Sequence, residues 1–194
     1  MEITSAQLKE LRELTGISVM QCKKALEEAG GDMEKAKIIL QKKGGEIALK
    51  KSDRALGAGA IGSYVHSTHE VAALVQLSCE TDFVAKNEEF SALAREIAMH
   101  VAAQSPLYIT REEVTDEILA KAKEVFMAEV KDKPAEMQEK ILAGKIDAYF
   151  KDRILMEQPF IKDQDKTIGT LVSNAIQKFG ENVVISAISR LSVK

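Results

Sequence analysis

The feature that most constrains the fold is a change of hydrophobic period near residue 59. Upstream, apolar residues recur at the spacing of one face of a helix. From residue 59, the runs "AGAIGSYVH" and "VAALVQLSC" are rich in small, β-branched and apolar residues, and the turn-forming "STHE" separates them. Two such runs around a short polar turn predict a β-hairpin. The chain must therefore combine helices with an antiparallel sheet.

The first 44 residues predict three short helices, because helix-start and helix-stop signals alternate along them. Thr4 is a predicted N-cap, and Gln7 three residues later completes a capping box. The predicted cap and glycine stop of each helix are Thr4 and Gly16, Ser18 and Gly30, and Asp32 and Gly44. A unit of this size buries little surface, so we expect its helices to pack closely.

Residues 45–58, "GEIALKKSDRALGA", form a charged connector between this unit and the rest of the chain. We interpret the connector as a solvated linker or a short helix. It also carries Lys50, Lys51 and Arg54, a cluster of positive charge that suits contact with RNA phosphates.

Downstream of the hairpin, amphipathic patterns predict helices at residues 88–103, 115–130, 134–156 and 167–179. Gly144 is expected to bend or break the third of these helices, and Gly180 to end the last. The tail "NVVISAISRLSV" alternates, so it predicts a strand whose natural partner is the hairpin. The fold class is therefore α+β, with a three-helix unit followed by a small antiparallel sheet packed against helices.

The alternation of the tail also predicts two faces for this strand. Val183, Ile185, Ala187, Leu191 and Val193 are expected on one face, and Ser186, Arg190 and Ser192 on the other. An apolar strand is an unprotected edge when nothing covers it, so the tail is a candidate surface for a homodimer.

Charge and hydropathy exclude several classes of protein. Lys and Arg number 27 against 30 Asp and Glu, a net charge of -3, which argues against a dedicated DNA or RNA binder. No apolar run approaches the ~20 residues that a membrane span requires. No secretory signal precedes the first helix, so we expect a cytoplasmic protein in which Cys22 and Cys79 are reduced core thiols.

The sequence shows no catalytic constellation. It lacks a G-x-x-x-x-G-K-[ST] phosphate loop and a nucleophile elbow. His66 and His69 flank the hairpin turn, and a metal site there would need further ligands, for which Cys79 and Glu80 are candidates if the hairpin closes. We expect no metal and no cofactor, and a protein that works by contact rather than as an enzyme.

The segment Thr81-Asp82-Phe83-Val84 places a carboxylate beside a large aromatic ring, between a predicted strand and a predicted helix. In a structural role, Asp82 would cap the following helix and Phe83 would fold into the core. In a binding role, both side chains would project into solvent. Composition alone favours the structural role without deciding the question.

Three stretches resemble the bacterial elongation factor Ts family: "LRELTGISVMQCKKALEEAGGDMEKA", "HEVAALVQLSCETDFVAKNEEF" and "EQPFIKDQDKTIGTLV". The likeness runs from residue 2 to about residue 184, and the block "CETDFVAKNEEF" is long and specific. The resemblance implies a ubiquitin-associated-like three-helix domain at residues 1–44, a linker at 45–58 and the family's core, or dimerisation, domain at 59–194.

For function, the resemblance implies a guanine nucleotide exchange factor that binds the GDP-bound GTPase elongation factor Tu. The segment that would enter the GTPase and disturb its Mg²⁺ and phosphate site is Thr81, Asp82, Phe83 and Val84. The matching contacts of the N-terminal domain are Leu11, Arg12, Thr15, Gly16 and Met20, with Lys9 as a further candidate.

Some positions depart from the family pattern. Val19-Met20 stands where the family commonly has two methionines, and Ser186, Ala187 and Ile188 stand where it often carries paired arginines and a phenylalanine. The short members that this chain resembles tend to form homodimers. The alternative function is an RNA- or ribosome-associated module that would use the basic residues Lys42, Lys43, Lys50, Lys51 and Arg54.

Overall fold

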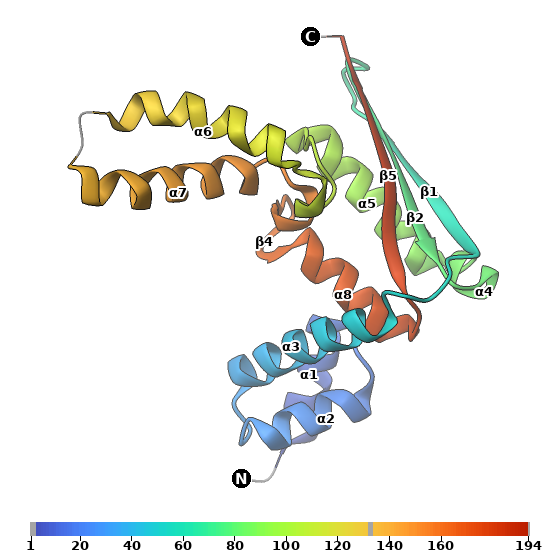
Figure 1. Cartoon of the computed structure of the whole chain (residues 1–194). Coiled ribbons are helices and arrows are strands. Elements are labelled where there is room, and N and C mark those ends of the chain that lie inside the picture. The colour runs from blue at the N-terminus through green and yellow to red at the C-terminus, as the bar shows by residue number, and fades with distance from the viewer. Residues whose placement is uncertain (1–2, 132–133, 194) are drawn as a thin grey trace.

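The computed structural model of the protein describes residues 3–131 and 134–193. Met1, Glu2 and Lys194, which the predicted domain ranges include, lie outside the described residues. Figure 1 shows a helical unit at the N-terminal end, a sheet with helices on one side, and a pair of long helices that projects from the body. The fold class is α+β, as the sequence predicted.

The N-terminal unit is helical, as predicted. It consists of α1 (Ser5–Thr15), α2 (Val19–Glu28) and α3 (Met33–Lys51). The predicted caps are confirmed, because the Thr4, Ser18 and Asp32 side chains each accept a hydrogen bond from the N–H three residues later. The helices enclose a small core of their own, whose fully buried members include Leu11, Ile17, Cys22 and Leu26.

Helix α3 does not end at Gly44, so that prediction was wrong. The helix continues to Lys51 because Gly44 faces α8 (Ile168–Phe179) rather than a turn. A Cβ atom at residue 44 would lie 2.1 Å from the Gln177 amide nitrogen, which donates a 2.8 Å hydrogen bond to the Leu40 carbonyl oxygen. Glycine therefore serves close helix packing here. The predicted domain boundary at residue 44 falls inside a continuous helix.

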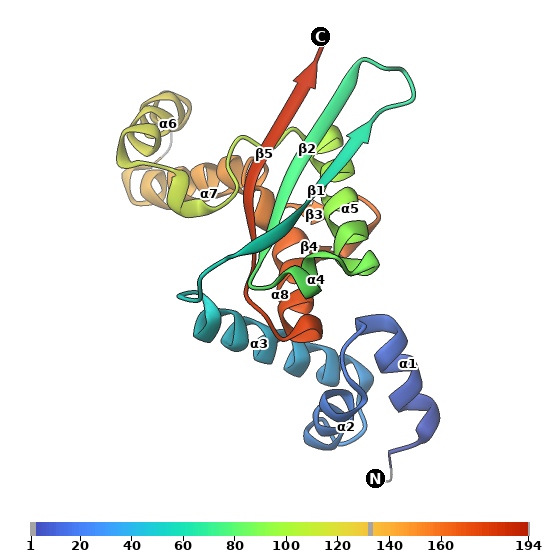
Figure 2. The same ribbon diagram turned by 90° about the vertical axis from the view of Figure 1, so that its right-hand side faces the viewer.

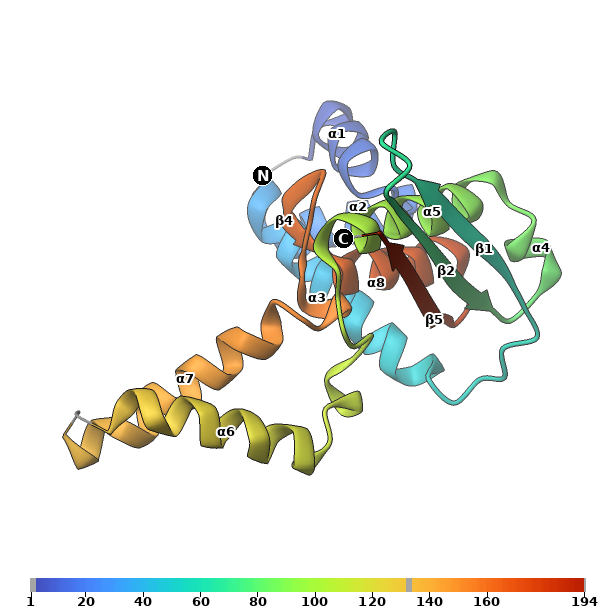
Figure 3. The ribbon, with the colours of Figure 1, turned by 90° about the horizontal axis from the view of Figure 1, so that it is seen from above.

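The predicted hairpin and its C-terminal partner strand are confirmed. Strands β1 (Ala58–Val65), β2 (Val71–Cys79) and β5 (Val183–Ser192) form an antiparallel sheet in the order β1-β2-β5. Helix α5 (Glu88–Gln104) covers one face of this sheet, as Figures 2 and 3 show. It comes close because Gly62 lacks a side chain, since a Cβ there would lie 2.1 Å from the Ala94 carbonyl oxygen.

A β-bulge changes which residues of β5 face the helices. Ile185 pairs with Leu77 and Ala187 pairs with Gln76, so Ser186 is the extra residue on β5. Because a strand alternates with a period of two, one inserted residue exchanges the two faces beyond it. The single alternation predicted for the tail is therefore wrong after Ser186.

Beyond the bulge, Leu191 and Val193 point away from the helices and are 72% and 76% exposed. Ile188 packs against the core instead. Arg190 donates from Nε to the Ala102 carbonyl oxygen at 3.0 Å. That carbonyl lies in the last turn of α5, where the residue four positions on is Pro106, which has no N–H to donate. Arg190 thus supplies a partner that the helix cannot.

The helices predicted for residues 115–156 form a projecting arm. They are α6 (Asp116–Val130) and α7 (Ala135–Lys151), which lie side by side in Figures 1 and 3. Helix α7 runs through Gly144, so of the bend or break expected there the break does not occur. The helix ends at Lys151, so the predicted end at residue 156 was wrong. Leu142, Ile146 and Phe150 bury themselves against the first helix of the arm and its base.

The remaining elements are short. They are α4 (Asp82–Ala85), the 3-10 helices η1 (Arg111–Glu113) and η2 (Leu155–Glu157), and the strands β3 (Pro159–Phe160) and β4 (Asp163–Thr167). The sequence did not predict the β3–β4 hairpin, which leads directly into α8. Within residues 3–131 and 134–193, no helix is both long and apolar enough to cross a lipid bilayer.

Candidate functional site

Phe83 projects from the protein surface. It is 82% exposed on the short helix α4, whereas its neighbour Val84 is 4% exposed and belongs to the main core. Thr81 caps this helix, because its side-chain oxygen accepts a hydrogen bond from the Val84 N–H at 3.5 Å. Thr81 and Val84 are therefore held on either side of the Asp82–Phe83 pair, and the Phe83 ring is presented to solvent.

The structural role considered for this segment is wrong on both counts. Phe83 is not part of the core, and the following helix α5 is capped by Asn87, whose side chain accepts from the Glu89 N–H at 2.9 Å. Asp82 is exposed and forms a 2.7 Å ion pair with Lys86. The hydrogen bond from Lys86 lowers the pKa of Asp82. Because both groups are in water, the pair is weak, and the carboxylate can exchange it for another partner.

The backbone ahead of Phe83 is tied to a residue that sequence reasoning missed. Glu181 accepts hydrogen bonds from the Glu80 and Thr81 N–H groups at 3.1 and 3.0 Å, and from the Thr81 hydroxyl at 2.6 Å. The signal available in the sequence was the Gly-Glu-Asn block after α8, which marks a helix end but names no partner. A pairing between residues 100 positions apart lies beyond any local pattern.

The Thr15–Gly16 turn and the start of α2 form a second exposed corner. Gly16 ends α1 with a left-handed φ of 69°, and Met20 is 69% exposed on the first turn of α2. Arg12 is exposed beside them, and Thr15 is half-buried. These predicted contact residues therefore lie along one stretch of the chain, from the last turn of α1 to the first turn of α2.

The prediction that Leu11 contacts a partner needs correction. Leu11 is fully buried in the core of the N-terminal unit, so its side chain offers no surface to a second protein. It supports the corner from inside, where its carbonyl oxygen accepts a 2.6 Å hydrogen bond from the Thr15 hydroxyl. Lys9, the further candidate, is exposed and pairs with Glu13 at 3.8 Å.

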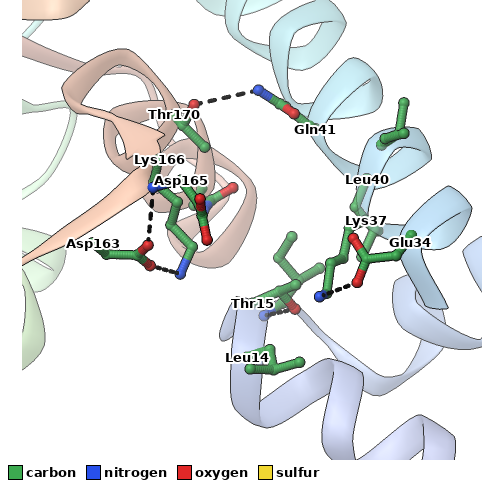
Figure 4. Close-up of a pocket in the computed structure, with 13 residues that line it drawn as sticks. Leu14, Thr15, Glu34, Lys37, Leu40, Gln41, Asp163, Asp165, Lys166 and Thr170 are labelled. Atoms are coloured by element: carbon green, nitrogen blue, oxygen red, sulfur yellow. Dashed lines mark hydrogen bonds and ion pairs between the residues drawn. The ribbon is translucent and has the colours of Figure 1, made fainter. Parts of the chain in front are cut away.

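A cleft of about 500 Å³ lies beside this corner, between the N-terminal unit and the β4–α8 region. Figure 4 shows residues from both walls, among them Leu14, Thr15, Lys37, Gln41, Asp163, Lys166 and Thr170. Two ion pairs line the cleft, one in each wall: Lys37 pairs with Glu34 and Lys166 with Asp163, each at 2.7 Å. Leu14, which is 46% exposed, adds an apolar side chain to this lining.

The geometry does not support a metal site on His66 and His69. Cys79 pairs with Ala58 at the end of the hairpin opposite the turn, so the suggestion that Cys79 and Glu80 join the histidines is wrong. His66 Nδ1 instead lies 3.1 Å from a tyrosine hydroxyl on β1. In the part of the chain that the structure describes, no three metal-binding side chains cluster together.

Three of the five basic residues of the RNA-binding alternative are engaged within the protein, whereas Lys42 and Lys50 are exposed. Lys43 forms an ion pair with a carboxylate of α2, Lys51 donates to the Gly180 carbonyl oxygen, and Arg54 pairs with Glu80. Cations that neutralise local groups add less to a phosphate-binding surface. No specific observation on the described residues favours this alternative.

Comparison with known proteins gives one consistent result. Residues 2–193 match the family described as Elongation factor TS. Elongation factor Ts of Geobacter sp. (strain M21) is 50% identical over 187 residues, which cover 95% of this chain and 87% of that relative. The proteins of the same name from Thermotoga petrophila and Geotalea uraniireducens are each 47% identical. Those alignments cover 100% of this chain, and 97% and 90% of the two relatives.

Proposed function

This chain belongs to the elongation factor Ts family, and on that premise we propose that it is a guanine nucleotide exchange factor for elongation factor Tu. It binds the GDP-bound GTPase during translation elongation and speeds the release of GDP, with no bond chemistry of its own. The observation that carries this proposal is the exposure of Phe83 between two anchored residues. Exposed aromatic side chains, Phe included, are enriched in the buried cores of protein–protein interfaces.

In the proposed mechanism, Asp82 and Phe83 enter the GTPase between two of its helices and displace the loops that hold Mg²⁺ and phosphate. Mg²⁺ demands near-ideal octahedral geometry, so a small displacement of its ligands weakens its binding. Burying the Phe83 ring contributes only about 1.5–3 kcal/mol. Each decade of weakened nucleotide affinity requires about 1.4 kcal/mol. Release of a tightly bound nucleotide therefore needs further contacts.

We assign those further contacts to the N-terminal corner, where Arg12, Thr15, Gly16 and Met20 face solvent or the neighbouring cleft. The cleft of Figure 4 would receive a segment of the nucleotide-binding domain of the GTPase. By linkage, bound GDP lowers the affinity of this protein for the GTPase by the same factor by which this protein lowers the affinity for GDP. That reciprocity lets the factor leave once a nucleotide has returned.

A fluorescent-GDP release assay with elongation factor Tu tests the proposal. The parent chain should accelerate release, and the variants Phe83→Ala and Asp82→Ala should lose much of that acceleration. The matched control is Val125→Ala, which trims an exposed apolar residue on the arm and should behave like the parent. Release no faster than the spontaneous rate would rule out the exchange function. If the Phe83 and Asp82 variants both release GDP at the parent rate, insertion of this segment is ruled out but the exchange function is not.

We further propose that the protein forms a homodimer through the face of the sheet opposite α5. The outward positions of β1, β2 and β5 carry no charged residue. Their exposed apolar members include Ile61, Val65, Leu74 and Leu191. An uncharged face can meet its own copy across a two-fold axis without bringing like charges together. Two sheets of this kind pack face to face at a spacing of about 10 Å.

A further inference from the structure

The turn after α8, residues 180–182, is bonded to two distant parts of the chain. Gly180 ends α8 in the left-handed conformation, with a φ of 72°, and so directs Glu181 and Asn182 away from the helix axis. On one side the turn contacts Glu80 and Thr81, just ahead of Phe83. On the other side it contacts the end of α3, which carries the N-terminal unit.

Glu181 satisfies three donors of the segment that leads into α4. One carboxylate oxygen accepts from both the Glu80 and the Thr81 N–H groups, and the other accepts from the Thr81 hydroxyl. Hydrogen bonds to a carboxylate are stronger than bonds between neutral groups. Since the Thr81 hydroxyl hydrogen points at Glu181, its oxygen lone pairs are left for the Val84 N–H. Glu181 thereby also orients the cap of α4.

A second hydrogen bond joins the same two segments in the opposite sense, because the 180–182 turn donates to the Glu80 side chain. The Glu80 carboxylate accepts from the Asn182 N–H at 2.6 Å and from Arg54 at 3.3 Å. The hydrogen bond from Asn182 is the main cause that lowers the pKa of Glu80. The buried Asn182 side chain donates to the carbonyl oxygens of Ser52 and Arg54 at 3.5 and 3.3 Å. The 180–182 turn therefore connects the Phe83 segment to the end of α3.

Such support is needed because α4 cannot hold itself in place. It has four residues, and a helix of one turn is unstable without outside contacts, since nucleation costs more than its hydrogen bonds return. Phe83 makes no core contact that would fix it, as its exposure shows. The direction of the ring therefore depends on Val84 in the core on one side and on Thr81 on the other.

Resting on the proposed function, we propose that Glu181 is a positioning residue for nucleotide exchange, which holds Thr81 so that Phe83 is presented to the GTPase before contact. Ordering a segment in advance raises affinity, because less conformational freedom is lost on binding. A segment that is competent for part of the time binds with an affinity reduced by that fraction. Loss of Glu181 therefore raises the concentration of factor needed for half-maximal GDP release, and leaves the rate at saturation close to that of the parent.

Two variants at one position separate geometry from charge. Glu181→Ala removes all three acceptor contacts, and amide hydrogen exchange at Glu80 and Thr81 should become at least about tenfold faster, while exchange within β2 stays unchanged. Glu181→Gln should rescue the segment, because the amide oxygen still accepts from both N–H groups and its NH₂ group donates to the Thr81 oxygen. The control Glu124→Ala removes an exposed carboxylate on α6 and should match the parent.

The same variants are then compared in GDP release from elongation factor Tu. For Glu181→Ala, the half-saturating concentration should rise by about tenfold at a saturated rate within about twofold of the parent. Unchanged amide exchange in this variant, or faster exchange with an unchanged half-saturating concentration, would overturn the inference. So would a joint loss of the saturated rate and of thermal stability, which would mark Glu181 as a general structural residue. If the parent releases no GDP, the proposed function fails, whereas the amide measurements still report whether Glu181 holds the segment.

Discussion

The buried His100 ring and the Gln158 side chain are joined by a 2.9 Å hydrogen bond between His100 Nε2 and Gln158 Oε1. The other ring nitrogen, Nδ1, accepts from the Ile161 N–H at 3.3 Å, so Nε2 carries the proton. Gln158 in turn donates to the Asp152 carbonyl oxygen at 2.6 Å, just after α7. A neutral imidazole thus ties α5 to the base of the helical arm.

Protonation of His100 should destabilise the fold, because Nδ1 would then be a donor that faces another donor. Burial is the main cause that lowers the pKa of His100, and the hydrogen bond with Gln158 opposes it. The unfolded state therefore binds the proton first, so this stability is complete above about pH 6.5 and is lost as the pH falls through that value. The loss from this one group is at most about 1.4 kcal/mol per pH unit.

Urea unfolding from about pH 7.5 to about pH 5 measures this effect as the slope of the unfolding free energy with pH. The variant His100→Gln keeps a donor for Gln158 but cannot be protonated, so its slope should be smaller than that of the parent. Equal slopes for the parent and the variant would contradict the prediction.

Phe83→Ala should change the free energy of unfolding by no more than about 0.5 kcal/mol, because the ring is exposed. Val84→Ala, one residue along, should lower it by about 1.5 kcal/mol through lost burial. Thermal or urea unfolding of both variants, beside the GDP release assay, separates the two roles. A loss of stability in Phe83→Ala as large as that in Val84→Ala would show that the ring is packed in solution.

Met20→Ala should weaken binding of GDP-loaded elongation factor Tu by about tenfold without changing stability, because Met20 is exposed at the N-terminal corner that we propose as a contact surface. Leu11→Ala should lower the free energy of unfolding by about 2–5 kcal/mol, because it empties part of a core. Calorimetric titration measures the binding, with Met137→Ala on the arm as the exposed control. Parent-like affinity in Met20→Ala would remove this residue from the interface.

The two glycines in the middle of α3 should respond in opposite directions to alanine. Gly44→Ala places a Cβ against Gln177 and disturbs its bond to Leu40, which should cost about 1–3 kcal/mol. Gly45→Ala meets nothing within 4 Å and should stabilise the helix by about 0.5–1 kcal/mol. Urea unfolding gives both values, and a stabilising Gly44→Ala would mean that the Gln177 side chain moves aside without a net cost.

Leu191→Glu should convert a homodimer to a monomer, because it places a charge on each of two facing sheets. Light scattering at tens of micromolar should give the parent twice the mass of one chain and the variant the mass of one. Leu107→Glu, at an exposed apolar position outside the sheet, should remain dimeric. A monomer mass for the parent would refute the proposed dimer.

Structural features that depend on residues a few positions apart were predictable from the sequence. The Thr4 cap and its Gln7 partner lie three residues apart, and the hairpin depends on the alternation of two adjoining strands. The amphipathic pattern predicted a helix at residues 88–103, and α5 spans Glu88–Gln104. The candidate site was located differently, since composition left the role of Phe83 open and the family resemblance suggested a binding role.

Features that depend on distant contacts were missed. Gly44 has the appearance of a helix stop until α8 lies against it, and its neighbour Gln177 comes from the other end of the chain. The bulge at Ser186 is visible only in the pairing of β5 with β2. Glu181 gains its role by meeting Thr81, and the sequence between them gives no sign of that meeting.

The sequence by itself determined where helices begin, where strands alternate and which family the chain resembles. Capping, periodicity and turn chemistry act over a few residues, so they can be recognised from residues that are close in the sequence. Only the tertiary structure decided that Phe83 points outward, that Leu11 points inward, and that the Phe83 segment is held by Glu181. Burial and long-range hydrogen bonds exist only when distant segments pack together. Their free energy comes from surfaces that are far apart in the sequence and meet only in the folded protein.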